Sequence, residues 1–263
     1  MSFTIKVCSD LHINKYYPNF PTVRQLFNTN DSFIADICIL IGDITYFELI
    51  KFYKRFLTYI SPYFTLLVLI PGNHEYYNNT SKKRSIKELD QIVEKTFRDI
   101  PNLEILNNRY IDIGDVRIFG SILWSYVPSN VPDRGLTIYS DTSRIFFPKL
   151  LSRLEYNKLN YDSIRSLLQC IEKTKRDGMS LIVATHYSPT FDVFGGLNQE
   201  GYPDDIMNYW YCNNLDDLIN EKNMAIWLFG HTHTPYDEVK DGTIMLSNPY
   251  VLGYSPLLEL RIN

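Results

Sequence analysis

The chain has 263 residues, of which 45% are hydrophobic and 21% are charged, so it can bury a full core and is not expected to be disordered. The net charge of −4 gives no basic field for a phosphate backbone, so a nucleic-acid partner is possible but not favoured. The longest apolar run, residues 66–70, is far shorter than the roughly 20 residues of a membrane span, so no membrane partner is expected. With no apolar leader and four cysteines without paired spacing, we expect a reduced, cytoplasmic protein.

Short apolar runs alternate with helical patterns in the first hundred residues. Strands are predicted at residues 3–9, 37–41 and 65–70, and helices at about 47–59 and 85–97. The second strand is wholly apolar, as in strands covered on both faces. The alternation predicts βαβ units and a largely parallel sheet.

The pattern changes near residue 104. Residues 110–113 and 116–119 flank Gly114-Asp115, which suits a type II′ hairpin, and residues 122–124 could extend this sheet. The later predicted elements are an amphipathic helix at 161–176 closed by Gly178, strands at 181–184 and 225–229, a hairpin turn at 239–243 and a final strand at 257–262. Two loop-rich insertions, about 125–149 and 187–214, interrupt what we expect to be a single domain over residues 1–263.

All five histidines lie in polar clusters at the ends of predicted strands. The clusters are Asp10-Leu11-His12, Gly42-Asp43, Gly72-Asn73-His74-Glu75, His186 and Gly230-His231-Thr232-His233. Strand ends that meet would bring together imidazoles, carboxylates and an amide, which are ligands of borderline divalent metals. The donors exceed the needs of one ion with an open position, so two ions fit better.

Each cluster also has a structural alternative. Asp10 and Asp43 could be helix N-caps, Asn73 a turn residue and His186 a hydrogen-bonded loop histidine. Taken together, the clusters favour the metal interpretation, because the alternative does not explain why no histidine lies elsewhere.

In this order the clusters resemble the complete signature of the calcineurin-like metallophosphoesterases, and the resemblance spans nearly the whole chain. Smaller similarities, in Glu75-Tyr76-Tyr77, residues 111–124 and Ser247-Asn248-Pro249, resemble a subgroup of small phosphohydrolases. The resemblance implies a four-layer α/β/β/α sandwich of two mixed sheets with flanking helices. It also implies a site for two metal ions at the carboxyl ends of the strands.

The resemblance further implies roles for individual residues. The first metal would be held by Asp10, His12, Asp43 and His233, and the second by Asp43, Asn73, His186 and His231, with Asp43 bridging. His74 would contact the substrate phosphate, stabilising charge or protonating the leaving oxygen. Two divalent ions would activate a bridging hydroxide for in-line attack on a phosphomonoester or phosphodiester. We expect Mn²⁺, with Fe, Zn²⁺, Co²⁺ or Ni²⁺ as the alternatives.

The second cluster departs from the family's protein Ser/Thr phosphatases, which carry Gly-Asp-x-x-Asp-Arg-Gly. Here the run is Gly42-Asp43-Ile44-Thr45-Tyr46-Phe47-Glu48, so the aspartate that orients the catalytic histidine is missing and a protein phosphatase is not expected. Glu75 could supply that carboxylate or cap the turn that follows it, and we favour the cap.

The two insertions hold further candidates. Arg134 and Arg144 could contact phosphate or the leaving group, although a surface charge is the simpler interpretation of each. Tyr209-Trp210-Tyr211 could wall a pocket, but we favour a role in anchoring the loop. We expect a small-molecule or nucleotide phosphoester as substrate, with a nuclease or a non-catalytic metal-binding scaffold as the alternatives; the oligomeric state is not indicated.

Overall fold

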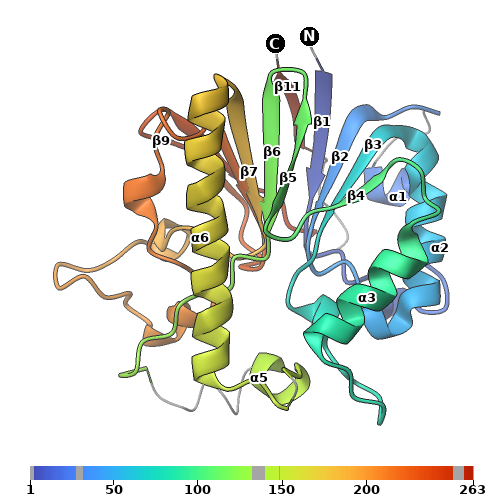
Figure 1. Cartoon of the computed structure of the whole chain (residues 1–263), viewed down its shortest axis with the longest axis horizontal. Coiled ribbons are helices and arrows are strands. Elements are labelled where there is room, and N and C mark those ends of the chain that lie inside the picture. The colour runs from blue at the N-terminus through green and yellow to red at the C-terminus, as the bar shows by residue number, and fades with distance from the viewer. Residues whose placement is uncertain (1–2, 28–31, 132–139, 148, 251–257, 263) are drawn as a thin grey trace.

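A computed structural model describes residues 3–27, 32–131, 140–147, 149–250 and 258–262. Two mixed β-sheets pack face to face, and helices cover their outer faces (Figure 1). The predicted four-layer α/β/β/α arrangement is therefore confirmed. In the described ranges, no helix combines the length and the apolar composition needed to cross a membrane.

The first sheet has the strand order β11-β1-β2-β3-β4. Its strands are β1 (Phe3–Cys8), β2 (Ala35–Ile41), β3 (Phe64–Ile70), β4 (Leu103–Ile105) and β11 (Leu258–Ile262). β1 to β4 run parallel, as predicted, and β11 joins the edge antiparallel to β1.

The second sheet has the order β5-β6-β7-β8-β10-β9. Its strands are β5 (Arg109–Ile113), β6 (Val116–Ser121), β7 (Ser180–Thr185), β8 (Ile226–Phe229), β9 (Tyr236–Lys240) and β10 (Thr243–Ser247). The two predicted hairpins form its antiparallel edges, and β6, β7, β8 and β10 run parallel between them.

The helices lie outside the two sheets. They are α1 (Val23–Phe27), α2 (Ile50–Ile60), α3 (Ile86–Phe97), α5 (Ser140–Arg144) and α6 (Arg153–Asp177). Short 3-10 helices occur at Ile13–Tyr16, Phe47–Leu49, Ser61–Tyr63, His74–Tyr76, Asp192–Phe194, Ile206–Trp210 and Asp216–Leu218. α2 and α3 lie on the side of the first sheet, and α6 on the side of the second (Figure 1).

Alternating side chains of the central strands form two separate apolar layers. Ile37, Ile39 and Ile41 of β2 point between the sheets, where they join Ile182 and Leu228 of the second sheet. The intervening side chains of β2, Cys38 and Leu40, belong to the layer that contacts the helices. Because both faces of the strand are covered, its sequence is apolar without interruption.

Three segments differ from the expectations. α6 begins at Arg153, eight residues before the predicted start, and a capping box between Ser152 and Glu155 fixes its first turn. β6 ends at Ser121, so the predicted extension through residues 122–124 is wrong; Leu123 has φ 55°, which no strand residue adopts. The insertion at 125–149 is not wholly irregular, because it contains α5.

Glu75 holds the loops that follow β2 and β3. Its buried carboxylate accepts hydrogen bonds from the backbone N–H groups of Gly72, Asp43 and Ile44, each at 2.8 Å, and from the Tyr53 hydroxyl at 3.1 Å. The preferred prediction, that Glu75 caps the turn after it, is therefore wrong. Burial and the nearby charge of Asp43 raise the pKa of Glu75 to about 7.

Glu75→Gln is expected to lower the free energy of unfolding by about 1–3 kcal/mol, because the new amide N–H₂ would face backbone N–H donors that lose their acceptor. Urea denaturation of the metal-free protein measures the change. Glu48→Gln is the matched control: Glu48 also accepts from two backbone N–H groups, of Asn79 and Thr80, but at a partly exposed position where water can replace it. Equal losses in the two variants would contradict the role given to Glu75.

Candidate metal centre

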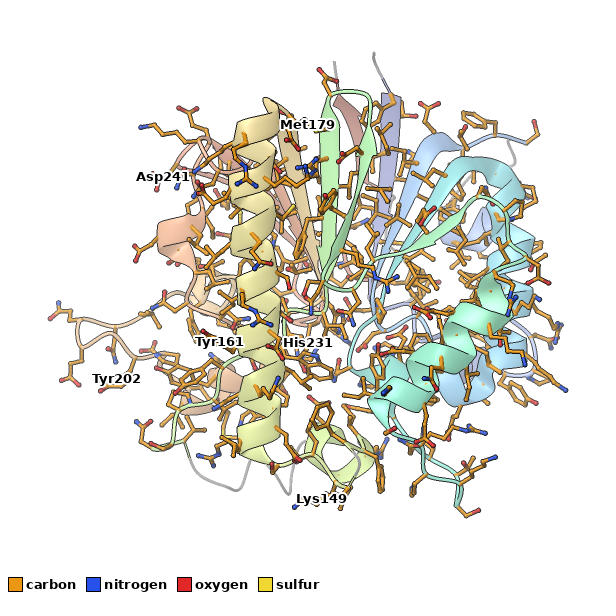
Figure 2. All side chains as sticks on the ribbon, viewed as in Figure 1. Lys149, Tyr161, Met179, Tyr202, His231 and Asp241 are labelled. Carbon is orange, nitrogen blue, oxygen red and sulfur yellow. The ribbon has the colours of Figure 1, made fainter. Side chains whose placement is uncertain are left out.

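The seven predicted metal ligands follow five parallel strands from both sheets. Asp10 and His12 come after β1, Asp43 after β2 and Asn73 after β3. From the second sheet, His186 comes after β7, and His231 and His233 come after β8. Figure 2 shows His231 beyond the strand ends, between α6 and the half of the molecule that carries α2 and α3.

The backbone is left-handed at five of these seven ligands. Asp10, His12, Asp43, His231 and His233 have φ between 44° and 66°, and they are five of the eight non-glycine residues with positive φ in the described part of the chain. Such conformations cost about 1–3 kcal/mol each and concentrate at functional sites. They let the chain turn sharply after β1, β2 and β8, so that the side chains point toward one another.

The first group of donors consists of Asp10, His12, Asp43 and His233, whose ligand atoms all lie within 4.8 Å of one another. Nε2 of His12 is 3.3 Å from Nε2 of His233, which is 3.4 Å from Oδ1 of Asp10. His233 is the most exposed of the four, with 51% of its side chain accessible, so this group opens to solvent.

The second group of donors contains Asp43, His186 and His231, again within 4.8 Å of one another. Oδ1 of Asn73 is 3.0 Å from Nε2 of His186, which is itself 3.2 Å from Oδ1 of Asp43. All seven donors are thus brought together, and Asp43 is common to both groups. This is the position from which a carboxylate can bridge two ions.

Two glycines allow the loops to approach this closely. A Cβ on Gly72 would lie 2.7 Å from Nε2 of His186, and one on Gly230 would lie 2.9 Å from a carboxylate oxygen of Asp10. Both distances are shorter than real Cβ contacts, so neither position accepts a side chain while the donors remain in place.

Burial sets the protonation of the imidazoles. It lowers the pKa of His231 to about 3 and that of His12 to about 4, so both rings are neutral at pH 7 and keep a lone pair for a metal. Burial alone would lower the pKa of His186, but the charges of Asp43 and Asp10 outweigh it and raise that pKa to about 9. Burial would raise the pKa of Asp43, yet His74 and His186 hold it well below its usual range.

The donors fit divalent metal ions. Nε2 of His231 is buried and has no hydrogen-bond partner among the described residues. Buried polar atoms in proteins nearly always have a partner, so an atom without one indicates a bound ion, a water or a functional role. A metal in the second group would satisfy this atom. Imidazole, carboxylate and amide oxygen are the donor types of borderline divalent ions, and each group leaves positions open for other ligands.

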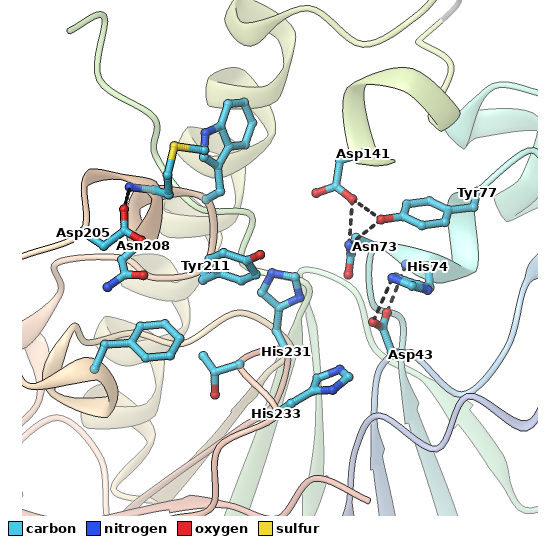
Figure 3. Close-up of a pocket in the computed structure, with 14 residues that line it drawn as sticks. Asp43, Asn73, His74, Tyr77, Asp141, Asp205, Asn208, Tyr211, His231 and His233 are labelled. Carbon is cyan, nitrogen blue, oxygen red and sulfur yellow. Dashed lines mark hydrogen bonds and ion pairs between the residues drawn. The ribbon is translucent and has the colours of Figure 1, made fainter. Parts of the chain in front are cut away.

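A cavity of about 580 Å³ opens over the donors (Figure 3). Asp43, Asn73 and His74 form one wall, and the opposite wall comes from the insertion at 187–214. The residues lining that wall are Phe194, Asp205, Met207, Asn208, Trp210 and Tyr211.

Tyr209, Trp210 and Tyr211 divide between the two predicted roles. The Tyr209 ring packs on Phe191, with centroids 5.3 Å apart, and the buried Trp210 ring packs on Tyr156 at the same distance. Those two rings anchor the loop, and Trp210 also lines the cavity. Tyr211 lines the cavity, and its ring lies 5.2 Å from that of His231.

His74 lies beside Asp43 in the first of the two cavity walls. Its Nε2 is 3.7 Å from Oδ2 of Asp43, its side chain is 29% exposed, and its ring packs on Tyr77 with centroids 4.3 Å apart. Within the described residues, Nδ1 of His74 has no hydrogen-bond partner, so no carboxylate orients this ring through Nδ1.

Arg144, one of the two arginines named from the sequence, is not among the residues that line the cavity. Arg144 is exposed, and its guanidinium carbon lies 5.4 Å from the centre of the Tyr77 ring. Arg134 lies outside the described residues.

Asp141 is a residue of the site that the sequence did not indicate. It is a buried residue of α5, lines the cavity and accepts a hydrogen bond from the side chain of Asn73. Neither a motif nor a helical period distinguishes it within the proline-containing insertion.

Comparisons with known proteins agree with this geometry. A protein of Acanthamoeba polyphaga mimivirus, described as uncharacterised, is 31% identical over 265 residues, which cover 95% of this chain and 91% of that protein. The crystal structure of phosphopantetheinyl hydrolase from Mycobacterium tuberculosis has a similar fold, with a TM-score of 0.68 at 16% identity over 97% of this chain and 95% of that one. The model of the calcineurin-like phosphoesterases matches residues 3–235, and the chain therefore belongs to this family.

Proposed function

We propose that this protein is a dinuclear metal-dependent hydrolase of a small phosphomonoester or phosphodiester. The observation that carries the proposal is the pair of donor groups that share Asp43 beneath an open cavity. Family membership supports phosphoester hydrolysis in general. Mn²⁺ is our first choice of ion because the carboxylate and amide oxygens suit it, with Fe, Zn²⁺, Co²⁺ and Ni²⁺ as alternatives because of the imidazoles.

In the proposed centre, Asp10, His12, Asp43 and His233 hold one ion, and Asp43, Asn73, His186 and His231 hold the other. Two such ions would lower the pKa of a water molecule and would supply positive charge for the phosphoryl oxygens. The neutral imidazoles of His12 and His231 bind without first losing a proton, because burial holds the pKa of each well below 7. Asp43 contributes its charge to both ions.

His74 is proposed to act on the substrate. It reaches the cavity from the loop after β3, beside the shared Asp43, and is partly exposed, so its ring can meet the phosphate or the leaving oxygen. Packing on Tyr77 and on Tyr46, whose ring centroid is 6.1 Å away, restricts its orientation. A restricted imidazole suits proton donation to a leaving group.

The cavity supports a small substrate. Its volume of about 580 Å³ lies within the usual range of small-molecule sites. The lining residues that are described include Asp43, Asp141 and Asp205 but no lysine or arginine, which counts against the nuclease alternative. Arg144, beside Tyr77, remains the proposed cationic contact at the edge of the site.

The direct test is a metal analysis of the purified protein together with turnover of 4-nitrophenyl phosphate and bis(4-nitrophenyl) phosphate in added Mn²⁺. We expect two bound ions per chain and hydrolysis of at least one ester, and the ratio of the two rates assigns a monoesterase or a diesterase. A protein that binds the ions but hydrolyses neither these esters nor oligonucleotides would be a scaffold, and the proposal would be wrong.

Asp43→Asn is expected to lower kcat/KM on the better ester by on the order of 100-fold or more. Replacing a residue that only hydrogen-bonds a metal ligand costs about 10–100-fold, and the loss of a ligand shared by both ions should cost more. Metal content measured on the same sample should fall for both ions. Asp99→Asn is the control, because this exposed aspartate pairs only with Lys54 among the contacts described. Near-normal turnover of Asp43→Asn with full metal content would contradict the bridging role.

His74→Asn should keep both ions but slow the ester with the poorer leaving group more. We expect kcat on an alkyl phosphate to fall by about 100-fold or more, which is in the range of general acid catalysis. The loss of kcat on 4-nitrophenyl phosphate should be much smaller. Steady-state kinetics on the two substrates, with metal content measured in parallel, gives the comparison. Equal losses on both substrates would argue against proton donation.

A further inference from the structure

Asp141 binds the amide of Asn73 from the side opposite to His186. Its Oδ1 accepts hydrogen bonds from Nδ2 of Asn73 at 2.7 Å and from the hydroxyl of Tyr77 at 2.6 Å. Its Oδ2 accepts from the hydroxyl of Tyr187 at 2.8 Å. Asp141 is 5% exposed, and its hydrogen bond to Asn73 joins it to the donor set (Figure 3).

This contact decides which atom of Asn73 faces the second donor group. An ionised carboxylate only accepts hydrogen bonds, so the amide nitrogen must point at Asp141. The amide oxygen then points the other way, where it lies 3.0 Å from Nε2 of His186. The reverse orientation would oppose two oxygens at Asp141 and turn an N–H₂ group, which cannot bind a cation, toward the metal site.

We propose that Asp141 is a positioning residue for the second metal, acting through Asn73. It fixes the amide with its oxygen toward the ion and, through the charge-assisted hydrogen bond, increases the negative charge on that oxygen. The inference rests on the proposed two-metal centre and extends it to a residue of the 125–149 insertion.

The surroundings of Asp141 suit this role. Its two tyrosine partners are packed on site histidines: Tyr77 on His74, at 4.3 Å between centroids, and Tyr187 on His231, at 4.0 Å. The carboxylate therefore cannot turn away without breaking hydrogen bonds to fixed rings.

The helix that carries Asp141 is tied to the loop that carries Asn73. The backbone oxygen of Arg144, at the end of α5, accepts from the backbone N–H and from Nδ2 of Asn78, at 3.0 and 3.2 Å. Asn78 lies five residues after Asn73. The insertion and the ligand loop are thus held in one relative position.

The test uses Asp141→Ala and Asp141→Asn in the full chain, titrated with Mn²⁺ by calorimetry and electron paramagnetic resonance. We expect the second ion to bind about 100-fold more weakly in Asp141→Ala and about 10-fold more weakly in Asp141→Asn. These values are the two ends of the loss in metal affinity that follows when a residue hydrogen-bonded to a metal ligand is replaced. The first ion should keep its affinity. At one intermediate Mn²⁺ concentration, the spin-coupled signal of the wild-type pair should give way to a mononuclear signal.

Asp90→Asn is the matched control, because Asp90 also accepts from a tyrosine hydroxyl, that of Tyr76 at 2.7 Å, but does not contact Asn73. It should retain the affinities of both ions. Unfolding of the metal-free variants identifies any general loss of structure, and Asp141→Asn carries the test if Asp141→Ala does not fold.

Wild-type affinity for the second ion in a folded Asp141 variant would overturn the inference, and so would equal weakening of both ions or the same loss in Asp90→Asn. A wild-type protein that binds two ions but hydrolyses no phosphoester would refute the proposed function alone, since the titration would still decide the role of Asp141.

Discussion

Side chains from distant parts of the chain can meet at one point only if the strands that carry them end at the same level. Here β1, β2 and β3 of one sheet and β7 and β8 of the other do so, and the backbone must turn within one or two residues of each end. The left-handed conformations of Asp10, Asp43 and His231 are the result. They are strained, and the surrounding hydrogen bonds hold them: the Glu75 carboxylate binds the N–H of Asp43, and the Asp10 carboxylate binds that of His231.

This geometry concentrates polar groups at the edge of an apolar interior. Asp43 and His186 are essentially inaccessible to water, and burial without partners would be costly for either charge. Their mutual attraction, at 3.2 Å, compensates in part, but it leaves His231 Nε2 without a partner in the described part of the molecule. The folded chain thus presents a set of lone pairs and negative charges that a pair of cations would complete.

Much of this could be predicted from the sequence, because the relevant signals are local. An uninterrupted apolar run such as residues 37–41 reports burial on both faces, and the polar residues directly after it mark the carboxyl end of the strand. Since parallel strands of one sheet share that end, the clusters at Asp10 and Asp43 had to lie close together, and the family resemblance added His231 of the other sheet. The fold and the convergence of the seven donors followed from these patterns and from the family resemblance they carry.

The features that the sequence did not reveal depend on partners far along the chain. Glu75 accepts hydrogen bonds from the N–H groups of Asp43 and Ile44, more than 30 residues before it. The local sequence has no pattern that would indicate such a distant hydrogen bond. Asp141 sits in a five-residue helix too short for a period, and its partners lie 46 to 68 residues away. The first turns of α6 were missed because Leu154, 82% exposed, breaks the amphipathic pattern there.

The cavity has walls of different origin, and this has a consequence for how the protein can diversify. The floor is built by strand-end loops in which Gly72 and Gly230 leave no room for change. The facing wall, with Phe194, Met207 and Tyr211, belongs to an excursion that contributes none of the seven donors. Changes in the length or sequence of that excursion would therefore alter which molecules the cavity admits while leaving the seven donors in place.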